Sequence, residues 1–327
     1  MQLDGKTFVV IGGAGFVGSH LVDMLLTHDP KQVRVLDDLR RGSRANLEGA
    51  LTDSRVELIE GSITDPALVG DVVKGGDGVF HLAALWLDEC LHHPRAAVDV
   101  NIGGTFNVIQ ACHEAGVNRI VYSSSASVYG NALEIPMTED HPFNNRTFYG
   151  ATKIAGEQMF RAFNEVHGLD YVGLRYMNIY GPRMDDKGTY VSVIVKVLDR
   201  LDRGLAPQIY GDGSQSYDFV HVKDVARANL LAMTSDATDE FFNIGVGVRT
   251  TIAELVGELL EITESSLEPE YQAAGMTFVT HRIGSTGKAR VQLGFEAEIS
   301  LEDGLRDVVQ WWRASQSNRP VTAGSQR

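Results

Sequence analysis

The chain has 327 residues, a length that predicts one large or two modest domains. Hydrophobic residues account for 43% of it and charged residues for 22%, which is ordinary for a globular protein and argues against a disordered or fibrous one. Asp and Glu number 43 against 29 Lys and Arg, and the net charge of -14 disfavours a general nucleic-acid or anionic-membrane surface, so any phosphate site must be local.

The first segment predicts a strand, a glycine turn and a helix. An apolar, β-branched run at 7–11 is followed at 12–18 by the sequence GGAGFVG. Gly12 and Gly15 let the backbone turn tightly and approach a pyrophosphate, and Gly18 lets the helix pack on the strand. The N–H groups at the helix start favour the phosphates. This order of features predicts a dinucleotide site.

A second strand at 32–36 ends in Asp37 and Asp38, about 20 residues after the glycines, where a carboxylate accepts hydrogen bonds from an adenosine ribose. We expect Asp37 to take this role. Because a carboxylate repels a 2′-phosphate, NAD is favoured over NADP as the cofactor. The arginines that follow would favour the opposite choice if they bound that phosphate; they are Arg40, Arg41 and Arg44.

Strands and helices keep alternating up to residue 176. The predicted strands are 55–60, 78–82, 118–123 and 170–176, and the predicted helices are 67–74, 97–115 and 149–167. This alternation predicts βαβ units and an α/β fold, a Rossmann-like doubly wound parallel sheet with helices on both faces.

The character of the chain changes after residue 176, where short segments are interrupted by glycine turns. We interpret 1–176 as an NAD-binding Rossmann domain and 177–313 as mainly a smaller, interleaved substrate-binding domain. Segments near 218–245 are predicted to return to the large sheet, while 189–203 and 252–262 are predicted helices. Residues 314–327, rich in Ser, Gln and Asn, are expected to form a flexible tail.

Tyr149 and Lys153 stand four residues apart and therefore share one face of the predicted helix. A lysine ammonium beside a phenol stabilises the phenolate, so the tyrosine, whose pKa is normally about 10, can take a proton from an alcohol near neutral pH. The same spacing also suits an amphipathic helix with a solvated lysine. The glycine turn and the serines at 123–125 favour the catalytic interpretation.

Taken together, these motifs resemble the extended short-chain dehydrogenase/reductase family, in particular NAD-dependent nucleotide-sugar epimerases and dehydratases of the UDP-glucose/UDP-galactose 4-epimerase type. The resemblance covers nearly the whole chain. It rests on GGAGFVG at 12–18, Asp37, FHLAA at 80–84, Asn101, SSSASVYG at 123–130, the Tyr149 and Lys153 pair, and RYMN at 175–178.

The resemblance implies roles for individual residues. Tyr149 is the base, Lys153 holds the nicotinamide ribose and lowers the tyrosine pKa, and Ser125 hydrogen-bonds the reacting hydroxyl. Asn101 supports the helix or a relay beside the site, or is simply a polar residue at a helix start. The implied cofactor-binding residues are Gly12, Gly15, Phe16, Val17, Gly18, Asp37, Ser62, Ile63, Leu82, Ala83, Ala84, Asn101, Ser123, Tyr149, Lys153 and Tyr176. The implied substrate-binding residues are Ser125, Ala126, Asn178, Tyr217 and Arg282.

The segment after Ser125 favours one branch of the family. Similar 4,6-dehydratases carry an Asp-Glu pair there and related decarboxylases a glutamate, whereas this chain has Ala126 and Ser127. Without a further acid or base, oxidation and re-reduction at one carbon are favoured, which is epimerisation at carbon 4. The expected substrate is a nucleotide sugar, with UDP as the expected nucleotide.

Two departures bear on that substrate. Tyr217 stands where the family has an arginine that grips the diphosphate, and a second phosphate arginine falls at Gly275. The candidate replacements are Arg183, Lys187, Arg249 and Arg282. An NAD-dependent dehydrogenase of a sugar, sugar acid or related alcohol, releasing NADH, is therefore the alternative function, and a non-catalytic NAD-sensing or scaffold protein is a third.

The resemblance also implies a homodimer that pairs through helices 97–115 and 149–167. Their apolar residues Val108, Ala111 and Phe160 are consistent with this, although the same residues would also suit packing on the sheet.

No targeting segment or metal motif is evident. No apolar run reaches the roughly 18 residues of a membrane helix. The N-terminus has no basic region followed by an apolar signal segment. Cys90 and Cys112 lack metal-ligand spacing and are too few for a disulfide framework, and the histidines, including His81 and His221, form no zinc motif. We expect a cytoplasmic protein without a metal, a membrane segment or a nucleic-acid partner.

Overall fold

The computed structural model describes residues 1–186, 192–274 and 279–317. Within them a seven-stranded sheet has the order β11-β6-β5-β4-β1-β2-β3, and every pairing in it is parallel. The strands are β1 (Thr7–Ile11), β2 (Gln32–Asp37), β3 (Val56–Glu60), β4 (Gly78–His81), β5 (Arg119–Ser125), β6 (Tyr171–Tyr176) and β11 (Glu240–Ile244). The predicted Rossmann-like sheet is confirmed.

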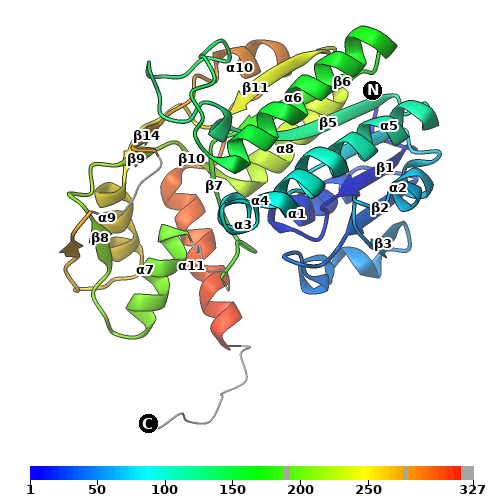
Figure 1. Ribbon diagram of the computed structural model, residues 1–327. Helices are drawn as coiled ribbons and strands as arrows, with labels where there is room; N and C mark the ends of the chain where they lie inside the picture. The colour runs from blue at the N-terminus through cyan, green and yellow to red at the C-terminus, as the bar shows by residue number, and fades with distance from the viewer. Residues whose placement is uncertain (187–191, 275–278, 318–327) are drawn as a thin grey trace.

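Helices cover both faces of this sheet (Figure 1). One face packs against α2 (Pro66–Val73), α5 (Thr105–Ala115) and α6 (Phe148–His167), and the other against α1 (Phe16–Leu26) and α8 (Val222–Thr234). Side chains alternate along each strand, so that in β1 Phe8 and Val10 enter one core while Val9 enters the other. Strands buried on both faces explain the continuous apolar runs in the sequence.

The chain reverses direction within the sheet between β1 and β4. After β3 it crosses back over β2 and β1 and continues outward through β4, β5 and β6. The loops that leave β1 and β4 therefore diverge from neighbouring strand ends and open a crevice between them. Both the glycine turn and the segment that follows His81 lie at this crevice.

A smaller lobe lies beside the carboxyl ends of the strands (Figure 1). Its core joins α7 (Val193–Asp202), α9 (Ile252–Ile262) and α11 (Leu301–Ser317). Short strands complete it: β7 (Asn178–Tyr180) with β10 (Phe219–His221), β8 (Gln208–Tyr210) with β13 (Glu270–Gln272), and β9 (Ser216–Tyr217) with β12 (Thr250–Thr251) and β14 (His281–Arg282). Between β10 and β12 the chain returns to the large sheet through α8 and β11, where β11 pairs with β6.

Three predicted boundaries differ from the structure. The helix predicted at 97–115 is divided into α4 (Pro94–Ala97), a π-helical turn η3 (Val98–Gly104) and α5. The helix predicted from 189 begins at Val193, with Ser192 as its N-cap, while 189–191 lie outside the described residues. Of the predicted tail, 314–317 continue α11, and the remainder lies outside the described residues. No helix in the described part of the chain is long and apolar enough to cross a membrane.

Candidate active site

The glycine turn packs so closely on its neighbours that two of its positions exclude a side chain. Gly12 has a φ of +83°, and a Cβ there would lie 2.7 Å from the backbone nitrogen of Ala83, across the crevice in the sheet. At Gly18 a Cβ would lie 2.2 Å from the carbonyl oxygen of Gly12, so the helix packs directly on the turn. Gly15 precedes α1 without a side-chain cap, which leaves the first N–H groups of the helix for an anion.

Asp37 lies at the end of β2 and is 7% exposed. Its two carboxylate oxygens accept hydrogen bonds from the N–H groups of Ala14 and Leu39, each at 2.9 Å, so the glycine turn and the carboxylate are held together. Desolvation raises the pKa of Asp37, and these N–H groups oppose the rise. The carboxylate keeps acceptor capacity that a ribose hydroxyl can use.

Two of the three arginines after β2 are paired with carboxylates. Arg40 pairs with Glu89 at 3.0 Å, and Arg41 pairs with Asp185 at 2.8 Å. The Arg41 guanidinium also lies over the ring of Trp86, 4.0 Å from its centroid. These contacts favour NAD over NADP, because the positive charges that a 2′-phosphate would need are already balanced.

Most of the predicted cofactor residues line one pocket of about 350 Å³ that runs along the carboxyl ends of the strands. Those that line it are Gly12, Gly15, Phe16, Val17, Gly18, Asp37, Ser62, Ile63, Leu82, Ala83, Ala84, Ser123, Tyr149, Lys153 and Tyr176. The pocket thus joins the glycine turn, a ribose-binding carboxylate and the Tyr149 and Lys153 pair, which is the set of groups that a dinucleotide requires. The residues present therefore fit NAD.

Local structure explains how Tyr149 and Lys153 reach this pocket. Thr147 caps α6 by accepting a hydrogen bond from the N–H of Gly150 at 3.1 Å, which places Tyr149 in the first helical turn. Lys153 follows one turn later and is 4% exposed. Its Nζ donates to the carbonyl oxygen of Ser123 at 2.6 Å and lies 5.8 Å from the centroid of the Tyr149 ring.

The two catalytic candidates have perturbed pKa values. Desolvation raises the pKa of Tyr149 to about 12, although a hydrogen bond with Ser125 and the charges of Arg41 and Arg282 oppose the rise. Desolvation also lowers the pKa of Lys153 to about 8. The ammonium of Lys153 is directed at the Ser123 carbonyl, and burial has the largest effect on the phenol, so the lowering of the Tyr149 pKa by Lys153 stays a prediction.

Asn101 supports α6 beside the site, as one of its predicted roles requires, but neither Asn101 nor Ala126 lines the cofactor pocket. Asn101 Oδ1 accepts from the N–H of Leu85 at 2.7 Å, and its Nδ2 donates to the Leu85 carbonyl at 2.9 Å and to Thr152 Oγ1 at 3.0 Å. It therefore fastens the segment after β4 to α6 and does not line the cofactor pocket. Ala126 is fully buried in the core, so its side chain cannot contact substrate. Ser125 itself accepts a hydrogen bond from the N–H of Ser127 at 3.1 Å.

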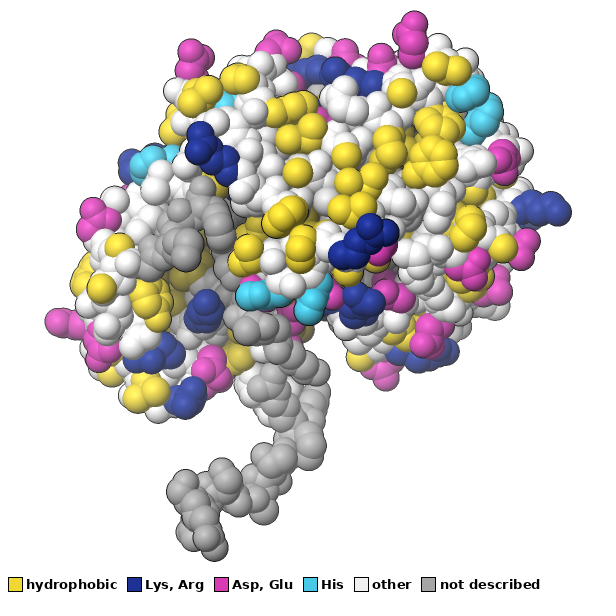
Figure 2. All heavy atoms as spheres, in the orientation of Figure 1, with side chains coloured by type: hydrophobic (Ala, Val, Ile, Leu, Met, Phe, Trp, Pro, Cys, Tyr) yellow, Lys and Arg dark blue, Asp and Glu magenta, His cyan; other side chains and the backbone are white. Residues whose placement is uncertain are grey.

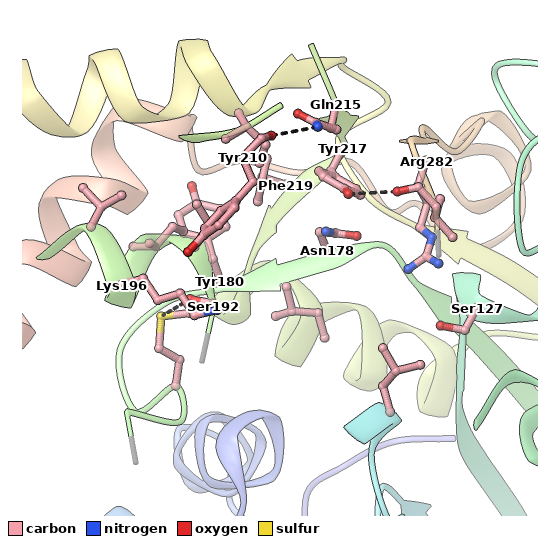
Figure 3. A pocket seen from close by; sticks show the side chains of 18 of the residues that line it. Ser127, Asn178, Tyr180, Ser192, Lys196, Tyr210, Gln215, Tyr217, Phe219 and Arg282 are labelled. Atoms are coloured by element: carbon pink, nitrogen blue, oxygen red, sulfur yellow. Dashed lines mark hydrogen bonds between the residues drawn. The ribbon is translucent and has the colours of Figure 1, made fainter. Parts of the chain in front are cut away.

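A second cavity, of about 680 Å³, lies between the large sheet and the smaller lobe. Three of the predicted substrate-binding residues, Asn178, Tyr217 and Arg282, line it together with residues of α7 and β8, whereas Ser125 and Ala126 do not (Figure 3). The hydroxyl of Tyr217 donates to the Val279 carbonyl at 3.0 Å. Arg282 lies directly opposite Tyr217 in the pairing of β14 with β9.

The other candidate phosphate ligands lie elsewhere. Arg183 pairs with Asp23 at 2.7 Å and lines the cofactor pocket. Arg249 donates to Ser216 Oγ at 3.1 Å. Lys187 and Gly275 lie outside the described residues. Across the described ranges, no group of three or more His, Cys, Asp or Glu side chains could hold a metal ion.

The sequence analysis missed a buried ion pair behind the catalytic helix. Arg175 on β6 and Glu157 on α6 lie 2.7 Å apart with side chains only 3% and 1% exposed. Ser124 on β5 donates to the same carboxylate at 2.6 Å. Glu157 stands one turn beyond Lys153, and this charge on the buried face of a predicted helix was the available signal.

Comparisons with known proteins agree with this geometry. Residues 8–245 match the model of the NAD dependent epimerase/dehydratase family. A UDP-glucose 4-epimerase of Mycolicibacterium smegmatis is 33% identical over 308 residues, which cover 93% of this chain and 98% of that protein. A dTDP-glucose 4,6-dehydratase of an Actinoplanes species is 32% identical over 324 residues, which cover 94% of this chain and 98% of that protein.

A solved structure shows the same likeness in three dimensions. It is a UDP-N-acetylglucosamine 4-epimerase from Methanobrevibacter ruminantium in complex with UDP-N-acetylmuramic acid, with a TM-score of 0.91 at 33% identity over 95% of this chain and 99% of that chain. Epimerases and dehydratases resemble the chain almost equally, so the comparisons do not separate these two reactions. The predicted relationship to extended short-chain dehydrogenases/reductases is nevertheless confirmed, and the chain belongs to the NAD dependent epimerase/dehydratase family, with NAD as its cofactor.

Proposed function

We propose that this protein is a nucleotide-sugar 4-epimerase, which oxidises carbon 4 of the sugar to a ketone and returns the hydride to the opposite face. The observation that carries this choice is the character of the substrate cavity. Among the described residues its only carboxylate is Asp199, which lies on α7 and pairs with Arg203 at 3.2 Å. Eliminating water from the sugar requires a further acid and base near the reacting carbons, and Ala126 and Ser127 supply neither.

Each group at the reacting end has a chemical task in this proposal. Tyr149 Oη takes the proton of the 4-hydroxyl while the hydride leaves carbon 4, and it gives the proton back when the ketone is reduced. Ser125 donates a hydrogen bond to the same oxygen as its charge changes. Lys153 supplies a positive charge beside the ribose and the phenol. The chemistry that bound NAD supplies is the reversible acceptance of a hydride.

The protein itself holds the cofactor and accommodates the intermediate. The glycine turn and the start of α1 bind the pyrophosphate, and Asp37 binds the adenosine ribose. The 4-keto sugar must turn over before the hydride returns to its other face. A cavity of about 680 Å³ leaves space for that rotation.

A panel of UDP-, GDP-, CDP- and dTDP-sugars tests the proposal. We expect one C4-epimeric pair to interconvert while absorbance at 340 nm stays constant after mixing. A stoichiometric rise at 340 nm with a sustained demand for added NAD would show the dehydrogenase alternative. A product that has lost water would show a dehydratase.

We also propose a homodimer, with a different contact surface from the one first predicted. Val108 and Phe160 are both 0% exposed and pack in the core against the sheet, so they are not available for a dimer contact. The outer side of the same helices carries Phe106, which is 42% exposed and lies 6.0 Å from Phe163 between ring centroids. Hydrophobic side chains gather on this face (Figure 2). Light scattering at micromolar concentration should give twice the monomer mass, and Phe106→Glu should reduce it to the monomer mass.

A further inference from the structure

The wall of the substrate cavity is basic although the protein as a whole is acidic. Among the described residues, five cationic side chains and a single carboxylate line it: Arg146, Lys196, Arg200, Arg203 and Arg282, with Asp199. The chain as a whole has a net charge of -14. Arg200 pairs with Glu270 at 3.7 Å and Arg203 pairs with Asp199 at 3.2 Å. The positive charge that remains in excess at the cavity wall favours an anionic ligand.

Four of the five cations form two separate groups, and the fifth, Arg146, directly precedes the Thr147 N-cap of α6. Lys196 and Arg200 belong to α7 and Arg203 follows its end, near Gln208 and Tyr210 of β8. Arg282 projects from β14, and Figure 3 shows it on the opposite side of the cavity from Lys196. A ligand that meets both groups must therefore carry negative charge at two places along its length.

Only one of these groups lies at the reacting end. Arg282 extends toward the space between Asn178 and Ser127, which lies just beyond the end of β5 (Figure 3). Its charge acts on Tyr149, whose pKa it helps to lower. In an elongated nucleotide sugar the reacting carbon must lie at Tyr149, so the nucleotide and its diphosphate extend toward α7 and the sugar ring faces Arg282.

Arg282 is held by the fold at this place. Its carbonyl oxygen accepts a hydrogen bond from the N–H of Asp218 at 2.9 Å, and the Asp218 carboxylate is fully buried and accepts from Val246 and Gly247 at 2.7 and 2.9 Å. The strand that carries the guanidinium is thus fixed to the large sheet. A planar guanidinium on a fixed strand suits a carboxylate, which it can bind through two parallel hydrogen bonds.

We propose that Arg282 binds an acidic group on the sugar itself, so that the substrate is a nucleotide sugar whose ring carries a carboxylate. This inference rests on the proposed epimerase function and specifies its substrate class. Arg282 then selects among nucleotide sugars, while the cations of α7 serve the diphosphate that all of them share. Tyr217, its neighbour on β9, supplies an uncharged wall.

UDP-glucuronic acid and UDP-glucose provide a matched pair, because they differ only in the carboxylate that replaces the hydroxymethyl group at carbon 5. Binding of each is measured by calorimetry on the NAD-loaded protein, alongside the rate of epimerisation. We expect the wild type to prefer UDP-glucuronic acid, and Arg282→Gln to weaken binding of that compound about 10- to 150-fold, as the loss of one charge-assisted contact implies, with little change for UDP-glucose. Arg282→Lys keeps the charge without the paired geometry and should lie in between.

Arg203→Gln is the control, since it removes a cation from the other end of the cavity and should affect both compounds equally. Equal losses for both compounds in Arg282→Gln would overturn the inference and assign Arg282 to the diphosphate. A wild type that binds both compounds equally well would also overturn it while leaving the epimerase function intact. Binding of no member of the nucleotide-sugar panel would refute the proposed function instead.

Discussion

The buried pair behind the catalytic helix makes a sharp prediction. Glu157→Gln removes the negative charge but keeps the size of the side chain and an oxygen that can accept from Ser124. Arg175 then remains charged in a site where its side chain is 3% exposed. Its other hydrogen bonds, to Tyr129 Oη and the Glu139 carbonyl, both at 2.8 Å, carry no compensating charge.

Removing one partner of a buried pair costs about 3 to 5 kcal/mol, because the other charge is left without compensation in a poorly solvated place. Unfolding entropy is about 2.1 cal/mol/K per residue, so for a chain of this length that loss lowers the melting temperature by roughly 4 to 7 °C. The loss should also reduce turnover, because the pair fixes α6 against β5 and β6 and thereby positions Tyr149 and Lys153.

The assay compares the melting temperature and kcat of Glu157→Gln with those of a control variant in a matched exposed ion pair. Glu302 and Arg306 are 2.6 Å apart on α11, with side chains 58% and 57% exposed. Glu302→Gln should cost about 0 to 1 kcal/mol and leave kcat unchanged. Replacing both buried partners, as in Glu157→Leu with Arg175→Met, should recover much of the stability. Equal, small losses in Glu157→Gln and Glu302→Gln would refute the reasoning.

Three further predictions concern the cofactor, the base and pH. Tyr149→Phe should lower turnover roughly 10²- to 10⁴-fold while a fluorescence titration shows nearly unchanged NAD binding; retention of more than about a tenth of the rate would move the base elsewhere. Asp37→Ala should weaken NAD binding and reduce the preference for NAD over NADP. Unchanged titrations of both cofactors would assign binding of the adenosine ribose to Asp38 or the backbone instead. Burial lowers the pKa of His81 from 6.5 to about 3, so the folded protein keeps this ring neutral while the unfolded chain takes up a proton; its contribution to stability is complete above pH 6.5 and is lost as the pH falls toward 3. Between pH 7 and 4.5 the wild type should lose on the order of 2 kcal/mol more stability in urea than His81→Asn, and parallel losses would exclude His81 as the cause.

The sequence by itself determined the sheet and the cofactor half of the site. Runs such as 7–11 and 171–176 are mostly apolar because their strands are buried on both faces. A glycine turn followed by an acidic residue at the end of the next strand is typical of a dinucleotide site. These signals are local, since the residues that form each feature are near neighbours in the chain. The spacing of Tyr149 and Lys153 was also sufficient to place both side chains in one pocket.

Tertiary structure alone decided where Asn101 and Ala126 point and which charges meet. Asn101 lies in a π-helical turn and bonds to Leu85 and to Thr152, which is 51 residues away, and no spacing rule for an ordinary helix predicts that contact. Glu157 and Arg175 belong to a helix and a strand, and Arg282 meets Tyr217 only through the pairing of β14 with β9. The pKa of Tyr149 likewise depends on desolvation, which is the sum of all the neighbours that packing brings to the phenol and is not encoded by any short segment.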